Sequence, residues 1–348
     1  MYRYEVTIGI PIYNAEKYVR RALDSALCQT HKNIEVLVYD DASIDSSVAI
    51  VKEFQQNHPR GKDIHLIRHS QNQGIGITRN RILEEAQGKY LFYLDADDEI
   101  LPNTIERLCN EAKRINVELV YGSHLRLEEW RKDGKEYLFE YTNQTFSSSD
   151  EFAKFVYSKY DVIQVPVWNI LMQVDFLKLI NFHFPSVNFW EDFAATMFLP
   201  IYAKNVALIS DITYIYHCRY GSLSHFQKRS NIQKREIQSV IEAMSELKMK
   251  CMDFEQKVYF PQIYNKVMMT HFYMADFILL HHEIITPAFT NNEICDIMNS
   301  PLSFGEVLKY REARWMNSLL VIMGLLPPSL LVSLMRLLAY SRRLIWVF

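Results

Sequence analysis

The chain has 348 residues, 49% of them hydrophobic, and a formal net charge of −3. This composition is typical of globular proteins and argues against a long disordered segment, and the near-neutral charge gives no support for nucleic-acid binding. The length favours one large domain with an appendage, or two domains.

The cysteines and the N-terminus indicate a cellular compartment. The five cysteines are widely spaced without a C-x-x-C pair, so reduced thiols in the cytosol fit better than zinc ligands or disulfides. The apolar run "VTIGIPIY" is too short for a secretory signal. We therefore expect a protein that folds in the cytoplasm.

The first half of the sequence alternates between two apolar patterns. Short apolar runs predict strands at residues 6–12, 34–38, 64–67, 90–94 and 119–121, and helical spacing predicts helices at residues 19–27, 48–54 and 77–86. Strands that alternate with helices in this way predict an α/β domain with a mostly parallel sheet.

The stretch "KYLFYLDADDEILP" places four acids, Asp95, Asp97, Asp98 and Glu99, directly behind an apolar strand. Pro102 suits the first turn of the next helix. The acids therefore lie in a loop at the carboxyl end of a strand, where ligands of open α/β sheets bind.

Three interpretations of "DADD" remain open from this motif alone. A D-x-D loop can hold Mg²⁺ or Mn²⁺ through a carboxylate while the metal bridges two phosphates. A phosphatase loop would use Asp95 as nucleophile and Asp97 as acid, although Glu99 replaces the Thr or Val that such loops carry. A solvated helix N-terminus would also favour acids there.

The second half is less regular between about residues 150 and 224 and mainly helical from about residue 231. The last segment, residues 315–348, has no acidic residue, and Pro327–Pro328 divides it into two apolar halves that are each too short to span a membrane. An interfacial or re-entrant helical hairpin explains this composition, and a helical pair packed on the main domain is the alternative.

Several strand-end motifs, taken together, resemble those of the family 2 glycosyltransferases of GT-A fold. The motifs are "IPIYNAEKYV", "VLVYDDASIDSS" and "NQGIGITRNRILEEAQGKYLFYLDADD", and the likeness covers residues 6–102. A weaker likeness continues through "VWNILMQVDFL", "FWEDF" and "YIYHCRYGSLS". The loop "GIGITRN" lacks the third glycine of a dinucleotide-binding motif, so a Rossmann oxidoreductase is a poor alternative.

The resemblance implies a donor site for a nucleoside diphosphate sugar, most simply a UDP-sugar. Pro11 and Tyr13 would line the nucleotide site, and Asp41 would accept the ring N–H of uracil. Arg79 would reach the nucleotide, Asp95 would contact the ribose, and Asp97 would ligate Mn²⁺ or Mg²⁺ on the diphosphate. The structural alternatives are a core position for Tyr13 and an ion pair of Arg79 with a surface acid.

Three smaller points accompany these donor-site roles. Asp45 fits a turn or cap position. The family often has Gly where this chain has Ala42, which questions only the backbone angle of that loop. Family members invert the anomeric centre, which implies a single displacement and therefore no enzyme nucleophile.

The resemblance also assigns an acceptor side. In "FWEDF", Asp192 would be the general base with Glu191 beside it, and an ordinary Glu-Asp pair at a helix start is the alternative. The aromatic and polar residues Trp168, Asn169 and Trp190 would border the acceptor. His217 would contact the diphosphate or metal, or else be a structural histidine.

These expectations combine into one hypothesis. The protein is an inverting, metal-dependent glycosyltransferase that serves surface polysaccharide synthesis with a glycan or polyprenyl-linked acceptor, held at the inner face of the cell membrane by its tail. The alternative is a catalytically inactive nucleotide-sugar binder at the membrane. The expected domains are residues 1–228 (a nucleotide-binding half to 102 and an acceptor-binding half from 103), a helical region 229–314 and a membrane-associating tail 315–348.

Overall fold

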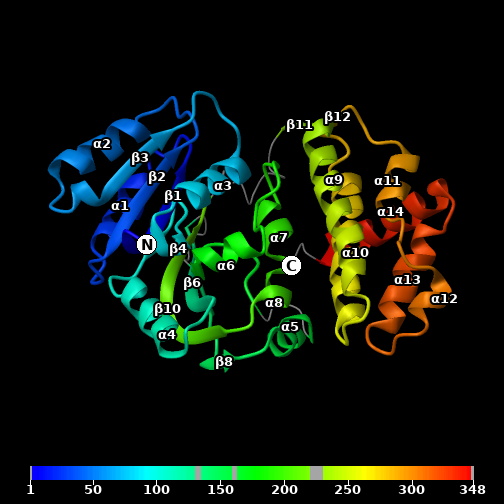
Figure 1. The fold of residues 1–348 in the computed structure, drawn as a ribbon. Helices are drawn as coiled ribbons and strands as arrows, with labels where there is room; N and C mark the ends of the chain where they lie inside the picture. Colours follow the sequence, from blue (N-terminus) through cyan, green and yellow to red (C-terminus); the bar gives the residue numbers. More distant parts are fainter. Residues whose placement is uncertain (1, 130–134, 159–162, 220–229, 346–348) are drawn as a thin grey trace. The chain divides into compact units, whose positions relative to one another are not determined.

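The structure is a computed structural model that describes residues 2–129, 135–158, 163–219 and 230–345. It divides into two compact units (Figure 1). The first comprises residues 1–156 and 163–222, and the second comprises residues 157–162 and 223–348. The finer subdivision expected at residues 102, 228 and 314 stays a prediction.

The first unit is built on one mixed sheet. Its described strands follow the order β3-β2-β1-β4-β9-β6-β10-β5, with β7 beside β6 and β8 beside β10. Their bounds are β1 Tyr4–Ile12, β2 Ile34–Asp40, β3 Ile64–Arg68, β4 Gly88–Tyr93, β5 Glu99–Ile100, β6 Leu119–Glu128, β7 Glu136–Phe139, β8 Gln144–Phe146, β9 Ile170–Gln173 and β10 Val206–Cys218.

Strand direction confirms the expected mostly parallel sheet. β1 pairs in parallel with β2 and β4, β2 with β3, and β6 with β10. The short β9 runs antiparallel between β4 and β6, so these two long strands still point the same way. The carboxyl ends of the long strands therefore meet at one edge.

Helices cover both faces of this sheet. The bounds in the first unit are α1 Val19–Leu27, α2 Ser47–Asn57, the 3₁₀ turn η1 Gly61–Asp63, α3 Ile75–Glu85, α4 Thr104–Ile115, α5 Ser149–Ser158, α6 Val174–Leu179, α7 Glu191–Thr196 and α8 Leu199–Tyr202. The buried stripe of α1 at Val19, Ala22, Leu23, Ala26 and Leu27 has helical spacing and packs on alternate residues of β1.

The other face of β1 carries α3. A Cβ at Gly9 would clash with Ile82 of α3, so a residue without a side chain lets this helix pack directly on the strand. The packing places the beginning of α3 near the site edge. It also fixes the position of Arg79, whose side chain is buried.

One expectation about this unit needs correction, and one strand was not predicted. α4 begins at Thr104, so Pro102 precedes the helix instead of lying in its first turn. Residues 206–218 form one 13-residue strand, β10, although Ser210 and Asp211 interrupt its apolar pattern. Irregular register around Ile212 accommodates the interruption.

The second unit is mainly helical, as expected. Its elements are β11 Ile232–Gln233, α9 Lys234–Lys250, the 3₁₀ turn η3 Cys251–Phe254, α10 Phe260–Leu280, β12 Ile285–Thr286, α11 Asn291–Ile297, α12 Phe304–Val307, α13 Arg314–Gly324 and α14 Pro328–Ile345. α13 and α14, orange and red in Figure 1, lie in the predicted tail, and both pack on α10 of the same unit. Within the ranges that the structure describes, no helix is long and apolar enough to cross a membrane.

Candidate functional site

The site edge collects the segments that follow β1, β2, β4 and β10. These strands end at Ile12, Asp40, Tyr93 and Cys218 and run in the same direction. Four stretches that are distant in sequence thus lie at one edge, where open α/β sheets bind ligands.

Asp41 is buried and holds its own surroundings together. One carboxylate oxygen accepts the Gln73 N–H at 2.8 Å and lies 2.8 Å from His69 Nδ1, and the other accepts the Gly74 N–H at 2.8 Å. A carboxylate oxygen has two lone pairs, so the second oxygen keeps an acceptor position for a ligand N–H. Its predicted role toward a base is compatible with this geometry and stays a prediction.

The turn that follows Asp41 has an unusual backbone. Ala42 adopts a φ of +62°, in the left-handed region that favours glycine. Opposite it, Asn14 accepts the Ile44 N–H at 3.0 Å, and Ser43 Oγ accepts the Asn14 N–H at 2.9 Å. Asp45 accepts the Ser47 N–H at 3.0 Å, as expected of a cap residue. The left-handed residue thus lies in a turn tied down from both sides.

Arg79 joins three carboxylates beneath the site edge, and we call Arg79, Asp95, Glu191 and Asp192 the Arg79 cluster. Nη1 lies 2.7 Å from Glu191 and 2.5 Å from Asp192, and Nη2 lies 2.9 Å from Asp95. The arginine side chain is 4% exposed. A single guanidinium therefore connects the loop after β4 with the start of α7, and its partners are acids of the site instead of the surface acid named as the alternative.

Burial changes the ionisation of this cluster. It raises the pKa of Asp192 and of Glu191, while the charge of Arg79 opposes the rise in both. The mutual repulsion of Glu191 and Asp192 raises the pKa of Asp192 further. A carboxylate with a raised pKa is a better proton acceptor than an ordinary aspartate.

Asp97 is paired with a second arginine, and we call Asp97, Arg219 and Tyr18 the Arg219 cluster. Asp97 Oδ2 lies 2.7 Å from Arg219 Nη2 and 2.9 Å from Nε. The guanidinium carbon lies 4.0 Å from the centroid of the Tyr18 ring, a cation–π contact. Both ionic side chains are about one-fifth exposed, so the pair lies at the surface of the site.

Asp97 suits a hard divalent cation. Its donors are carboxylate oxygens, it lies at the site edge, and burial raises its pKa while Arg219 opposes the rise. The guanidinium of Arg219 supplies a positive charge next to Asp97 Oδ2. The residues thus fit a metal, which would replace Arg219 at this oxygen.

The two remaining acids of the loop have structural contacts. Asp98 is fully buried, accepts the Tyr214 hydroxyl at 2.7 Å and accepts the His217 N–H at 2.8 Å. Burial raises the pKa of Asp98 well above its ordinary value. Glu99 contacts the ring of His217 at 2.9 Å. Two acids thus face the site and two anchor the loop to β10.

His217 lies between two glutamates. Its Nε2 lies 2.9 Å from Glu99 and its Nδ1 lies 2.6 Å from Glu129, which also pairs with Arg21 at 3.1 Å. Burial by itself would raise the pKa of Glu129, but the hydrogen bonds from Arg21 and His217 lower it overall. In this arrangement each ring nitrogen contacts a glutamate. A contact of His217 with a diphosphate or metal would therefore replace one of these two glutamate contacts.

Trp168 and Asn169 lie inside the first unit. The Trp168 ring stacks on Tyr214, with centroids 4.5 Å apart. Asn169 donates both amide hydrogens to the carbonyls of Gly122 and Ser123. If the amide N–H groups of Asn169 contacted the sugar acceptor directly, one of these two hydrogen bonds would have to break.

The other predicted residues lie nearer the surface. Tyr13 is 51% exposed, so the alternative of a core position is wrong, and it follows the buried Pro11 of β1. Trp190 is partly exposed and precedes α7 with a φ of +62°. This backbone is strained for a bulky residue, and such strain is common at functional sites.

Arg219 and Tyr214 were missed by the sequence analysis. Arg219 stands two residues after His217 in "YHCRYGS", a stretch already singled out, but its neighbour Tyr18 is distant in sequence. Tyr214 reads as one of many apolar residues of a strand. Its hydroxyl also accepts the Asp95 N–H at 3.2 Å, so it fixes both ends of the acidic loop.

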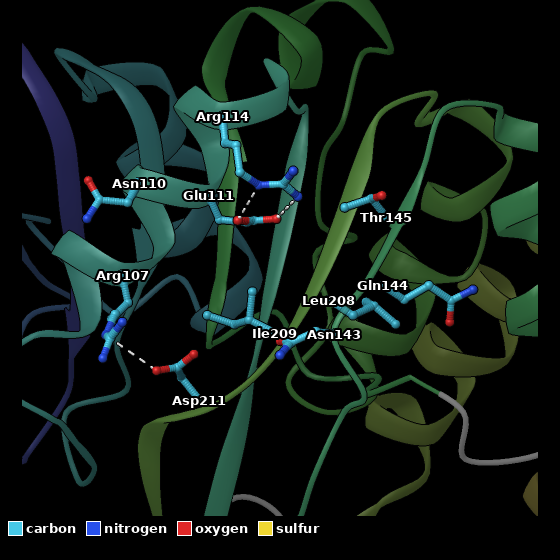
Figure 2. Close-up of a pocket in the computed structure, with 10 residues that line it drawn as sticks. All are labelled: Arg107, Asn110, Glu111, Arg114, Asn143, Gln144, Thr145, Leu208, Ile209 and Asp211. Carbon is cyan, nitrogen blue, oxygen red and sulfur yellow. Dashed lines mark hydrogen bonds and ion pairs between the residues drawn. The ribbon is translucent and has the colours of Figure 1, made fainter.

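A cavity of about 420 Å³ lies elsewhere in the first unit and contains none of the predicted site residues. Figure 2 shows Arg114 turned toward Glu111 of the same helix, and Arg107 lies 3.4 Å from Asp211. Its arginines are thus matched by neighbouring acids, and the cavity carries no functional assignment.

Known proteins agree with this architecture. Residues 7–166 match the family model described as glycosyl transferase family 2. This segment of the chain is therefore similar to glycosyltransferase family 2. Glycosyltransferase GlyA of Streptococcus pneumoniae is 25% identical to this protein over 248 residues, which cover 70% of the chain and 34% of GlyA. The chain thus spans about a third of that relative.

Solved structures share the fold. The crystal structure of S. aureus TarS 1-349 in complex with UDP-GlcNAc superposes with a TM-score of 0.64 at 17% identity, covering 92% of this chain and 90% of TarS 1-349. Mannosyltransferase PcManGT from Pyrobaculum calidifontis, in complex with GDP-Man and Mn²⁺, gives a TM-score of 0.52 at 14% identity, covering 97% and 88%. The chain therefore has the expected GT-A-like fold with a helical C-terminal region.

Proposed function

We propose that this protein is an inverting, metal-dependent glycosyltransferase that moves a sugar from a nucleoside diphosphate sugar to an acceptor hydroxyl. The observation that supports it most is the Arg79 cluster. One guanidinium holds the predicted ribose ligand Asp95 and the predicted base Asp192, 2.9 Å and 2.5 Å away. Donor and acceptor residues thus share one rigid, buried support.

Asp192 would act as the general base. It would take the proton of the acceptor hydroxyl while that oxygen bonds to the anomeric carbon. The bond from this carbon to the diphosphate oxygen breaks, and its electron pair leaves with the nucleoside diphosphate. A single displacement of this kind inverts the anomeric centre. Such a base contributes roughly 10²- to 10⁴-fold to the rate.

Asp97 would hold Mn²⁺ or Mg²⁺ together with the diphosphate of the donor. The bound cation would offset the negative charge that develops on the leaving group. Asp95 would orient the ribose, and Asp41 would bind the base through its remaining acceptor position. Arg219, once displaced from Asp97, stays at the same edge with its charge available to phosphate oxygens.

The choice of donor class has support from the fold neighbours. TarS was crystallised with UDP-GlcNAc and PcManGT with GDP-Man, both nucleoside diphosphate sugars. We propose a UDP-sugar because Asp41 suits the ring N–H of uracil. Thermal stabilisation by UDP-glucose, UDP-galactose, their N-acetyl forms and GDP-mannose, each with Mn²⁺, identifies the sugar.

We also propose that the acceptor is a glycan or polyprenyl-linked sugar of surface polysaccharide, and that the protein acts at the inner face of the cell membrane. Support comes from the tail, which lacks acids between residues 315 and 348. It lies in the second unit as the helical pair α13–α14.

Asp192→Asn tests the reaction. We expect release of nucleoside diphosphate from the stabilising donor, measured with an acceptor extract, to fall by about 10²- to 10⁴-fold. Donor affinity should stay within about twofold, because the amide oxygen can still accept from Arg79. The control is Asp211→Asn, a change in an acid that is 39% exposed and pairs with Arg107.

The inactive-binder alternative gives a different result. It predicts that the wild type binds donor without turnover, so that Asp192→Asn changes nothing. Full activity in Asp192→Asn would show that another group is the base.

A further inference from the structure

The helices α13 and α14 both present large apolar side chains to solvent, and we call these residues the tail surface. On α13 the exposed positions follow helical spacing, and Trp315 is 89% exposed. The members of the tail surface are Trp315, Met316, Leu319, Ile322, Leu325, Leu330, Leu337 and Leu338. So many large exposed apolar residues on neighbouring helices are unusual for a surface that faces only water.

The opposite face of the pair is already used by the fold. Leu320 and Val321 of α13 and Leu331 and Met335 of α14 are buried, and both helices pack on α10. The tail surface thus consists of residues that the folded unit does not use for packing. Its exposure does not result from an incompletely packed core.

A buried polar contact fixes which side of α13 faces inward. The Asn265 amide of α10 donates to the Asn317 carbonyl at 2.8 Å, and the Asn317 amide donates to the Pro261 carbonyl at 3.0 Å. Rotation of α13 would break both of these buried hydrogen bonds, at a cost in stability. The outward orientation of Trp315, Leu319 and Ile322 is thus enforced.

The surrounding charge points to one kind of partner. Residues 309–348 contain six of the 38 Lys and Arg residues of the chain but only one of its 41 Asp and Glu residues. Lys309, Arg311 and Arg336 are exposed beside the apolar residues. Apolar residues with Trp and a basic flank match an anionic lipid surface, which attracts basic segments.

A second copy of the chain fits less well. A two-fold interface places the same patch of both copies in contact. That arrangement would bring the basic flanks together without acids to neutralise them, since Glu312 is the single acid in this segment. Like charges in contact oppose association.

We propose that the tail surface of α13–α14 lies in the headgroup region of an anionic bilayer, with the helix axes in the plane of the membrane. This deepens the proposed membrane association and names its contact. The folded pair would bind as a preformed unit, so no segment has to unfold or insert across the bilayer.

Vesicle flotation of the full chain tests the proposal without donor or acceptor, so its outcome is independent of the proposed catalysis. We expect binding to phosphatidylcholine vesicles that contain about 30% phosphatidylglycerol, weaker binding to pure phosphatidylcholine, and partial release by roughly 0.5 M salt. The triple variant Trp315→Ser, Leu319→Ser, Ile322→Ser should lose at least about tenfold in vesicle affinity.

The matched control is Met249→Ser with Val258→Ser, which removes exposed apolar residues elsewhere on the same unit, 64% and 77% exposed. It should bind like the wild type. Unchanged thermal unfolding of the triple variant verifies that its fold is intact. The proposal is overturned if the triple variant, folded, still floats with anionic vesicles, or if the wild type is a dimer that the triple variant dissociates.

Discussion

Two arginines hold acids at the site edge, and they do so in different ways. Arg79 is 4% exposed and contacts three carboxylates. Arg219 is 22% exposed and contacts one carboxylate, with the Tyr18 ring on its face. The first arrangement is a network around a buried arginine, and the second is a single pair whose arginine is partly exposed.

The difference indicates two roles. Removing Arg79 would leave several carboxylates uncompensated in a buried position, so it belongs to the permanent structure of the site. Arg219 can be replaced at Asp97 by another cation at modest cost, because a partly exposed pair contributes little. We infer that Arg79 positions the acids of its cluster and that Arg219 occupies the place that a metal ion would take beside Asp97.

The largest expected effect on stability is that of Arg79→Met. We expect the free energy of unfolding, from urea titration at neutral pH, to fall by about 3–5 kcal/mol. The loss should shrink at acidic pH, where the cluster acids become protonated. The control is Arg81→Met, since the Arg81–Glu84 pair is half exposed and its removal should change the free energy of unfolding far less. Equal losses in both variants would remove the distinction between buried and exposed arginines.

Arg219→Ala is expected to increase the affinity for Mn²⁺, a smaller effect than the loss of stability in Arg79→Met. Mn²⁺ titration followed by electron paramagnetic resonance, without nucleotide, should show about three- to tenfold tighter binding, because a competing cation is gone from Asp97. Asp97→Asn should weaken binding instead. Unchanged or weaker Mn²⁺ binding in Arg219→Ala would contradict the placeholder role.

Glu191→Gln tests the Arg79 cluster through the pH dependence of kcat/KM. The charge of Glu191 raises the pKa of Asp192, so its removal should lower that pKa and let the base work at lower pH. The acidic limb of the kcat/KM profile is expected to shift down by about half to one pH unit. A profile that stays in place would mean that the limb does not report Asp192.

The smallest expected effect is that of Ala42→Gly, which touches neither arginine. Glycine relieves the left-handed backbone at φ +62° but gains entropy in the unfolded chain. We expect a rise of at most about 1 kcal/mol in the free energy of unfolding. Mn²⁺ affinity should stay that of the wild type, which makes this variant a baseline for the two arginine variants.

The sequence predicted the part of the fold that follows local rules. Short apolar runs and helical spacing located β1 to β4 and α1 to α3, and the order of strand-end motifs led to the family. The length of β10 escaped because Ser210 and Asp211 interrupt its apolar pattern, and the structure resolves this with an irregular register at Ile212. Local patterns do not show which interruptions a strand tolerates.

The contacts of the site were harder to predict than its residues. Glu191 and Asp192 lie more than a hundred residues after Arg79, and no periodicity connects them. The likeness to the family brought both segments to one site, but the pairing of their charges depends on burial. For the same reason Arg219 was missed, although it is adjacent to motifs that the analysis used.

The amide pair of Asn265 and Asn317 has a consequence for how this protein can vary. Because the Asn265 amide donates to the Asn317 side chain, replacing either residue alone removes a buried hydrogen bond from the α10–α13 contact. The two positions should therefore change together among related chains. Residues of the tail surface have no such hydrogen bonds and can be exchanged for other apolar residues. We therefore expect the inward face of α13 to be more conserved among related chains than its outward face.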